Sequence, residues 1–222
     1  MIKQLTKHCR LNITILLVCM SIFCLAFSLV RFFITGTKVY LFLNWNLFLA
    51  FIPWCLGTII LIKGYEKKKI AFVTFLFCWL LFFPNSPYIL TDFFHLKDRS
   101  FVPLWFDWAL ILSFAWTGLV YGFSSLADIE QILLTKFKKR HVTLLVIAFL
   151  FLSGFGVYIG RFLRWNSWDV ISNPLIIASD ISIRIIHPFL HARTWLITLI
   201  IGLLLNMMYF SFKYTTLSQS KG

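Results

Sequence analysis

Residues 11–33, LNITILLVCMSIFCLAFSLVRFF, form an apolar run whose single charged residue is Arg31. A helix needs about 20 consecutive apolar residues to cross the hydrocarbon core of a bilayer, and this run has that length. It is too long for the apolar core of a signal peptide, and no small-residue cleavage site follows it. The stretch therefore predicts a first transmembrane helix.

The rest of the chain has the same character. Its 222 residues are 60% hydrophobic and only 13% charged, whereas a soluble domain carries about 25% charged residues. Further apolar runs follow at 41–62, 70–90 (broken at 84–87), 103–126, 141–160 and 194–212. We predict an all-α polytopic membrane helix bundle, a single transmembrane domain over residues 1–222 with six transmembrane helices.

The basic charge gives the predicted orientation. The net charge is +13, and dense basic clusters at 63–69 and 136–140 flank apolar runs. Short loops rich in Lys and Arg are typical of the cytoplasmic side of a membrane, so we predict no nucleic-acid partner. With six spans both termini lie on one side, and the basic excess predicts a cytoplasmic N-terminus and C-terminus. Most acidic residues then lie at the outer face, where we expect any chemistry.

Residues 171–192 are too polar to span a bilayer and too apolar for a plain loop. Asp180 and Arg184 are four residues apart on one stripe. The neighbouring stripe repeats every four residues, at Ile177, Ile181, Ile185 and Phe189. This pattern predicts an amphipathic helix in the outer interface.

Residues 82–96, FFPNSPYILTDFFHL, place two prolines inside a predicted span. Proline removes a backbone donor and disrupts a helix. Ser86 suits the N-cap of a restarted helix and Pro87 its first position, so that a helix N-terminus would face an anionic group. The restarted helix would carry Tyr88, Asp92 and His95 on one stripe. The alternative is a simple proline kink in which Asn85 repairs the backbone.

Three more polar clusters fall at the same predicted depth. Each has a plainer explanation: a polar helix cap, an acid favoured by the helix dipole, or Arg and Trp anchors in the headgroups. Together they favour a shared outer-face pocket, because polar residues inside a membrane are costly unless paired. Its predicted residues are Asn44, Asn46, Asn85, Ser86, Tyr88, Asp92, His95, Asp107, Arg161, Arg164, Asn166 and Asp169.

Three long strings resemble a known family. They are FPNSPYILTDFFHL (83–96), PLWFDWALILSFAWTGL (103–119) and GVYIGRFLRWNSWDV (156–170). They are similar to the bacterial family called domain of unknown function 1361, over a region from about Asn44 to about Tyr209. The resemblance implies a multi-pass protein of the bacterial cell (plasma) membrane. It implies no activity, substrate, cofactor or catalytic residue.

The leading hypothesis is an integral membrane protein that binds an anionic group through Arg161 and Arg164, with a membrane lipid headgroup as partner. A lipid-acting hydrolase or transferase, with Asp92 and His95 as base or cation ligands, is the alternative. A transporter and an assembly partner of another membrane protein also stay open. We assign no catalytic residue, no metal ligand and no cofactor, since His187 and His191 have no nearby acid to complete a metal site.

Overall fold

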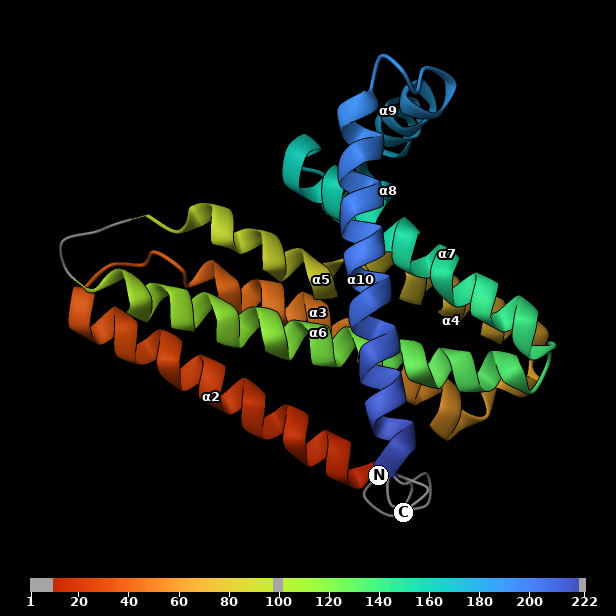
Figure 1. Ribbon diagram of the computed structural model, residues 1–222, viewed down its shortest axis with the longest axis horizontal. Coiled ribbons are helices and arrows are strands. Elements are labelled where there is room, and N and C mark those ends of the chain that lie inside the picture. Colours follow the sequence, from red (N-terminus) through yellow and green to blue (C-terminus); the bar gives the residue numbers. More distant parts are fainter. Residues whose placement is uncertain (1–9, 98–101, 220–222) are drawn as a thin grey trace. The chain divides into compact units, whose positions relative to one another are not determined.

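The computed structural model describes residues 10–97 and 102–219, and in this part of the chain it contains helices and no strand (Figure 1). Six helical segments are long and apolar enough to cross a membrane: Leu11–Thr35, Phe42–Lys63, Lys69–His95, Leu104–Leu134, Lys139–Leu163 and Ala192–Thr215. The predicted all-α chain with six transmembrane helices is therefore confirmed.

The chain forms two compact units, one that reaches to Ile132 and one that begins at Leu133. The elements up to the boundary are α2 (Leu11–Thr35), α3 (Phe42–Lys63), η1 (Tyr65–Lys67), α4 (Lys69–Phe82), α5 (Asn85–Tyr88), η2 (Ile89–His95) and α6 (Leu104–Leu134). Those of the second unit are α7 (Lys139–Tyr158), η3 (Ile159–Leu163), α8 (Asp169–Ser172), α9 (Pro174–Ile186) and α10 (Ala192–Gln219).

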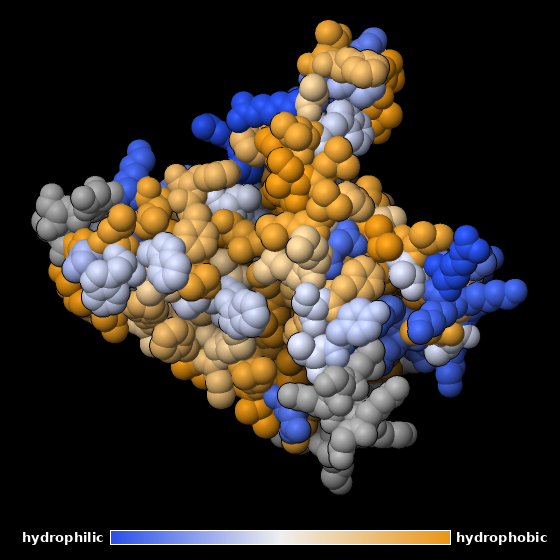
Figure 2. Space-filling model, in the orientation of Figure 1, coloured by the Kyte–Doolittle hydropathy of each residue, from blue (hydrophilic) through white to orange (hydrophobic). Residues whose placement is uncertain are grey.

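In the first unit α6 is the central helix. Within its most apolar window 72% of the residues are buried, against 17% for α2. Gly118 and Gly122 let α5 approach α6 closely, because a Cβ on Gly122 would lie 2.7 Å from that of Ser86. The surface of the spans is largely hydrophobic in the view of Figure 2, as lipid-facing helices require. Helix α2 therefore presents most of its surface outward and is held by few contacts.

The fourth span continues to Leu134, eight residues beyond its predicted end at 126. The prediction stopped before Asp128 and Glu130, because a charge inside a span is costly. In the structure Asp128 forms an ion pair with Arg10. A neighbouring helix therefore supplies the counter-charge that lets α6 carry this acid.

The proline break is gentler than predicted. Helix α4 ends at Phe82, but Phe83 and Pro84 keep right-handed helical dihedral angles (φ −55°, ψ −39° and φ −60°, ψ −21°). The chain then continues through one α-helical turn into a 3₁₀ helix at Ile89–His95. The prediction of an α-helix restarting at Ser86 and Pro87 with a free N-terminus is wrong.

Local hydrogen bonds explain why no free helix end forms. The backbone N–H of Ser86 donates to the carbonyl of Phe83 at 3.1 Å, and that of Tyr88 donates to Pro84 at 3.1 Å. Asn85 Nδ2 donates to the carbonyl oxygen of Phe82 at 2.8 Å. The side chain of Asn85 thus replaces a backbone donor, which is the alternative that the sequence left open.

The second unit is built on the contact of α7 with α10. Gly154 faces the backbone of Thr198 and Gly202, and the rings of Phe155 and Trp195 stack at 5.8 Å. Small residues let membrane helices approach closely, and that contact gives van der Waals stabilisation.

We expect Gly154→Ala to destabilise the second unit. The new Cβ would lie 2.9 Å from the carbonyl oxygen of Thr198, so the helices must separate at a cost of about 1–3 kcal/mol. Gly57→Ala is the matched control, because its nearest neighbours lie 3.8 Å away and alanine favours a helix by about 1 kcal/mol. Thermal unfolding in detergent should move in opposite directions for the two variants. Equal effects would contradict the packing argument.

Candidate functional site

The predicted pocket residues divide between the two units. Those from Asn44 to Asp107 lie in the first unit, and those from Arg161 to Asp169 lie in the second. A pocket shared by all of them stays a prediction. We therefore describe the two groups separately.

Asp107 forms a buried ion pair with Arg31 at one end of the first unit. Arg31 Nε donates to Asp107 Oδ1 at 2.6 Å, and Nη2 donates to Oδ2 at 3.1 Å. Both side chains are only 3% exposed. Such a bidentate arginine–carboxylate pair is among the strongest side-chain interactions. The sequence analysis placed Asp107 in the predicted outer-face pocket and did not identify this partner.

Four more groups surround Arg31, and the first is Thr35, whose Oγ1 accepts a bond of 3.5 Å from Nη1. The same Nη1 donates to Thr37 Oγ1 at 3.0 Å and to the carbonyl of Val39 at 3.3 Å. The guanidinium also lies 4.6 Å from the centre of the Tyr40 ring. Tyr40 adopts a φ of 70°, which is unusual for a residue other than glycine. No sequence pattern predicts these contacts of Arg31, because Tyr40 and Thr37 lie between the predicted spans.

Asn46 and Asp92 are brought together as the pocket prediction requires. Asn46 Nδ2 donates to Asp92 Oδ2 at 2.8 Å, and Asp92 is 1% exposed. His95 is exposed, and its ring meets that of Phe42 at 5.4 Å. Asp92 and His95 are three residues apart in the 3₁₀ helix η2 and therefore share one side of it, but the side chain of Asp92 is buried and that of His95 is exposed.

The remaining predicted residues of this unit support the backbone. Asn44 Nδ2 donates to Ser28 Oγ at 3.0 Å. The Ser86 hydroxyl donates to the carbonyl of Ala50 at 3.3 Å and so links α5 to α3. The carbonyl of Tyr88 accepts a bond of 2.6 Å from Thr91 Oγ1. These contacts serve helix packing, because they satisfy polar groups at membrane depth.

A second buried ion pair was missed by the sequence analysis. Arg10 pairs with Asp128, and its Nη2 donates to Thr58 Oγ1 at 2.8 Å. Its guanidinium also lies 5.4 Å from the centre of the Trp54 ring. Arg10 is 5% exposed. Arg10 precedes the predicted first span, and the structure buries it where α2 begins.

Polar contacts between α2 and α6 extend from one ion pair to the other. Ser21 Oγ lies 2.9 Å from the hydroxyl of Tyr121, and Cys24 Sγ lies 3.3 Å from Thr117 Oγ1. We call this series the α2–α6 seam; its pairs are Arg31–Asp107, Cys24–Thr117, Ser21–Tyr121 and Arg10–Asp128. Because α2 buries little apolar surface, the seam, together with the bonds to Asn44 and Thr58 of α3, provides its specific attachment.

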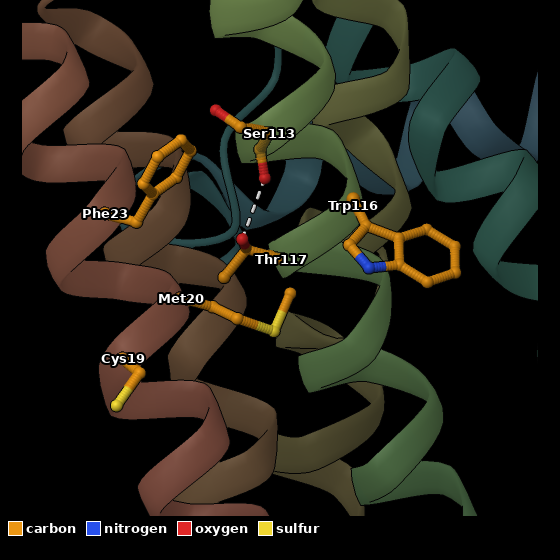
Figure 3. A pocket seen from close by; sticks show the side chains of 6 residues that line it. All are labelled: Cys19, Met20, Phe23, Ser113, Trp116 and Thr117. Atoms are coloured by element: carbon orange, nitrogen blue, oxygen red, sulfur yellow. Dashed lines mark hydrogen bonds between the residues drawn. The ribbon is translucent and has the colours of Figure 1, made fainter.

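A groove of about 350 Å³ lies beside the seam and is apolar (Figure 3). The hydroxyl of Thr117 donates to the carbonyl of Ser113 at 2.8 Å, and that of Ser113 donates to Leu110 at 2.8 Å. Both hydroxyls are thus directed to their own helix. The lining residues are Cys19, Met20, Phe23, Ser113, Trp116 and Thr117. None of the predicted pocket residues belongs to this groove.

In the second unit the predicted residues surround the end of the fifth span. Helix α7 passes into a π-helix at Ile159–Leu163, which ends at Arg164 with φ 62° and ψ 28°. The backbone N–H of Trp165 donates to the carbonyl of Ile159 at 3.4 Å. This left-handed position usually holds glycine. A single π-helical turn that follows an α-helix is frequently found at functional sites.

The acids of this region are already engaged. Asp169 Oδ2 accepts the backbone N–H of Asn166 at 2.7 Å and its Nδ2 at 3.3 Å. Asp180 accepts a bond of 2.8 Å from Trp165 Nε1. Within residues 10–97 and 102–219 the exposed Arg164 has no hydrogen bond or ion pair from its guanidinium. Arg164 is therefore available to an external anion.

Comparison with known proteins identifies a family. One family model matches residues 45–208, well over half of the chain, and its description is "Protein of unknown function (DUF1361)". No curated protein and no solved structure matches. The matched region includes Asp107, Asp128, Arg161 and Arg164, whereas α2 precedes it. The chain belongs to this family of proteins of unknown function, and its six apolar helices, each long enough to cross a bilayer, indicate a multi-pass membrane protein.

Proposed function

We propose that this integral membrane protein binds the anionic headgroup of a membrane lipid, or of a lipid-linked precursor, at the outer face of the cell membrane. Arg164 is the main ligand, and Arg161 contributes from the preceding turn. Phosphate and carboxylate groups are the anions that match the fork of an arginine side chain.

The conformation of Arg164 is the observation that carries this proposal. A left-handed residue other than glycine costs roughly 1–2 kcal/mol. Glycine would end the helix at no such cost, yet the position holds a long cationic side chain that is exposed. Residues held in sparsely populated conformations concentrate at ligand sites. The local strain thus supports a role for the guanidinium itself.

The surroundings of Arg164 favour an anion over an internal partner. Asp169 orders the loop by accepting bonds from Asn166, and Asp180 is bonded to Trp165 and Arg184. The carboxylates closest in sequence are therefore committed to other groups. In this proposal Asn166 and Asp169 shape the loop, and they do not contact the ligand.

The first-unit residues have a smaller part than the sequence predicted. Ser86 and Pro87 present no helix end, and Asp107 is paired with Arg31. Asn46 and Asp92 bond to each other. The proposed binding site therefore consists of Arg161 and Arg164, and the first unit serves as membrane-embedded scaffold.

The test is the substitution Arg164→Gly. It removes the charge and also relieves the left-handed strain, so we expect unchanged or increased thermal stability together with weaker binding. Loss of one charge-assisted hydrogen bond of about 1.5–3 kcal/mol corresponds to at least about a tenfold loss of affinity. Native mass spectrometry of the purified protein with added phosphatidylglycerol would measure the retained lipid.

Two control variants test whether lipid retention depends on the Arg164 side chain itself or only on the positive charge of the protein. Arg164→Lys keeps the charge and loses the fork, so an intermediate affinity is expected. Arg140→Ala removes an exposed arginine from the first turn of α7 in the same unit, at the opposite end of that helix, and should leave retention unchanged. If Arg164→Gly retained as much phosphatidylglycerol as the original protein, the proposed site would be excluded.

A further inference from the structure

Helix α9 has the reverse of the polarity that a water-facing helix needs. Its large apolar side chains point outward, and Leu175 is 83% exposed. The exposed apolar residues of this helix are Leu175, Ile176, Ile183, Ile185 and Ile186. Ile177 is buried and Ile181 is half-buried, so the predicted stripe of Ile177, Ile181, Ile185 and Phe189 does not form one outward face. A helix in water places its apolar stripe inward and its charges outward.

The charged stripe of α9 is turned toward its own unit. Trp165 Nε1, beyond the end of η3, donates to Asp180 Oδ2 at 2.8 Å. Arg184 Nη1 donates to the carbonyl of Asp180 at 2.6 Å. Trp195 Nε1, in the first turn of α10, donates to the carbonyl of Arg184 at 3.1 Å. The two bonds from Trp165 and Trp195 fix which face of α9 points outward.

The segment after α9 extends the exposed apolar surface. Phe189 is 95% exposed and Leu190 is 80% exposed. In Figure 2 hydrophobic colour covers much of the part of the surface that α9 occupies in Figure 1. His187 and Arg193, both exposed, border this apolar surface with groups suited to lipid phosphates. Apolar surface rimmed by basic groups is typical of a membrane interface.

The position of α9 in the chain indicates what covers this surface. It lies between the end of the Lys139–Leu163 span and the start of the Ala192–Thr215 span, so it is attached where two candidate spans leave the bilayer. Its 13 residues measure roughly 20 Å at about 1.5 Å per residue. The hydrocarbon core is about 30 Å thick, so α9 is too short to cross it.

We propose that α9 and residues 187–190 lie in the interfacial layer of the membrane, with the outward apolar face among the upper acyl chains. Burial of this face in lipid is favourable in proportion to the apolar area removed from water. The inward Asp180 and Arg184 then keep their partners inside the protein. This placement does not depend on anion binding at Arg164.

The placement is measurable with a polarity-sensitive fluorophore. Ile176→Cys and Phe189→Cys would each be labelled with a thiol-reactive nitrobenzoxadiazole dye, and the protein reconstituted in phosphatidylcholine nanodiscs. Nitroxide groups placed near the lipid headgroup or near the end of the acyl chain then quench according to depth. The unsubstituted chain, labelled in parallel, gives the background from its own cysteines.

Two positions calibrate the measurement. Lys138→Cys, exposed before α7, reports water, and Leu203→Cys, exposed near the middle of α10, reports the membrane centre. We expect blue-shifted emission at both α9 positions, with quenching at least about twofold stronger by the shallow nitroxide than by the deep one. Leu203→Cys should show the opposite order.

Three results would overturn the inference. Water-like emission at residues 176 and 189 would place α9 in solvent. Stronger quenching by the deep nitroxide would place it in the membrane centre. Blue-shifted emission without quenching by either lipid would show that protein, such as a second copy of this chain, covers the apolar face.

Discussion

Replacing Asp107 with Asn is expected to lower the free energy of unfolding by about 3–5 kcal/mol, because it leaves the Arg31 guanidinium buried without its counter-charge. Both side chains are almost inaccessible, and two hydrogen bonds join them. In a membrane the unpaired cation has no water to solvate it. Reversible unfolding in mixed detergent and dodecyl sulfate micelles, followed by circular dichroism, would measure the loss.

The double variant Arg31→Met, Asp107→Leu tests the cause. Replacing both partners of a buried pair by apolar groups of similar size is often nearly neutral, so most of the loss should be recovered. Recovery will be incomplete, because Thr37 and Val39 lose the donors that Arg31 gave them. Arg193→Ala, which removes an exposed cation over a ring, should cost less than about 1 kcal/mol. An equally small effect of Asp107→Asn would show that the pair is solvated.

The six spans could be predicted because hydrocarbon thickness imposes a length on each apolar run. The structure agrees where local composition decides, as in the run that became α2. The C-terminal end of α2 also has a local cause. Gly36 takes a φ of 63° just beyond Thr35, and its N–H donates to the carbonyl of Phe32 at 2.8 Å. Such a glycine is a common helix terminator.

The partners of charged residues could not be predicted in this way. Arg31 and Asp107 are 76 positions apart, and no periodicity connects them. The bias of Lys and Arg toward cytoplasmic loops predicts orientation, and it does not identify partners for Arg31 or Arg10. Only the packing of α2 on α6 shows that both arginines are buried. Asp107 was among the predicted pocket residues, whereas Asp128 and the two arginines were not.

The proline segment shows a different limit. Its sequence allowed either a restarted helix or a repaired kink, and the choice depends on tertiary packing. Gly118 and Gly122 of α6 leave room for Ser86 and Ile89 only if the chain continues along α6. A local cap at Ser86 would turn its hydroxyl away from Ala50, to which it donates. Packing thus favoured continuity over the local N-cap preference.

The α2–α6 seam joins these findings into one view of α2. An apolar helix gains little from contact with other apolar helices in lipid, because the surrounding chains are equally apolar. Specific attachment must come from close packing or from polar pairs, and α2 has few buried residues. The two ion pairs lie near its opposite ends, roughly 30 Å apart at about 1.5 Å per residue. Each pair should therefore hold its own end of the helix.

Replacing Asp128 with Asn is expected to release the Arg10 end of α2 selectively. Arg10 would keep its bond to Thr58 and its contact with Trp54, but its charge would be uncompensated. We expect a loss of about 3 kcal/mol, at the lower limit for a buried pair, because the side chain of Asp128 is 16% exposed. Hydrogen–deuterium exchange in nanodiscs should rise in the first turns of α2 and stay unchanged near Thr35. Asp107→Asn should give the reverse pattern.

A stricter test is whether the stability losses caused by Asp107→Asn and Asp128→Asn add in the double variant. Mutations separated by more than about 10 Å without shared partners usually add within roughly 0.5 kcal/mol. The variant carrying both Asp107→Asn and Asp128→Asn should therefore lose the sum of the two single losses, provided that each pair holds one end independently. Arg10→Lys keeps the positive charge but loses the forked guanidinium. It should therefore lower the free energy of unfolding by only part of the amount that Asp128→Asn does. A double loss no larger than either single loss would mean that α2 detaches as a whole once one pair is broken, and independent attachment at its two ends would then be wrong.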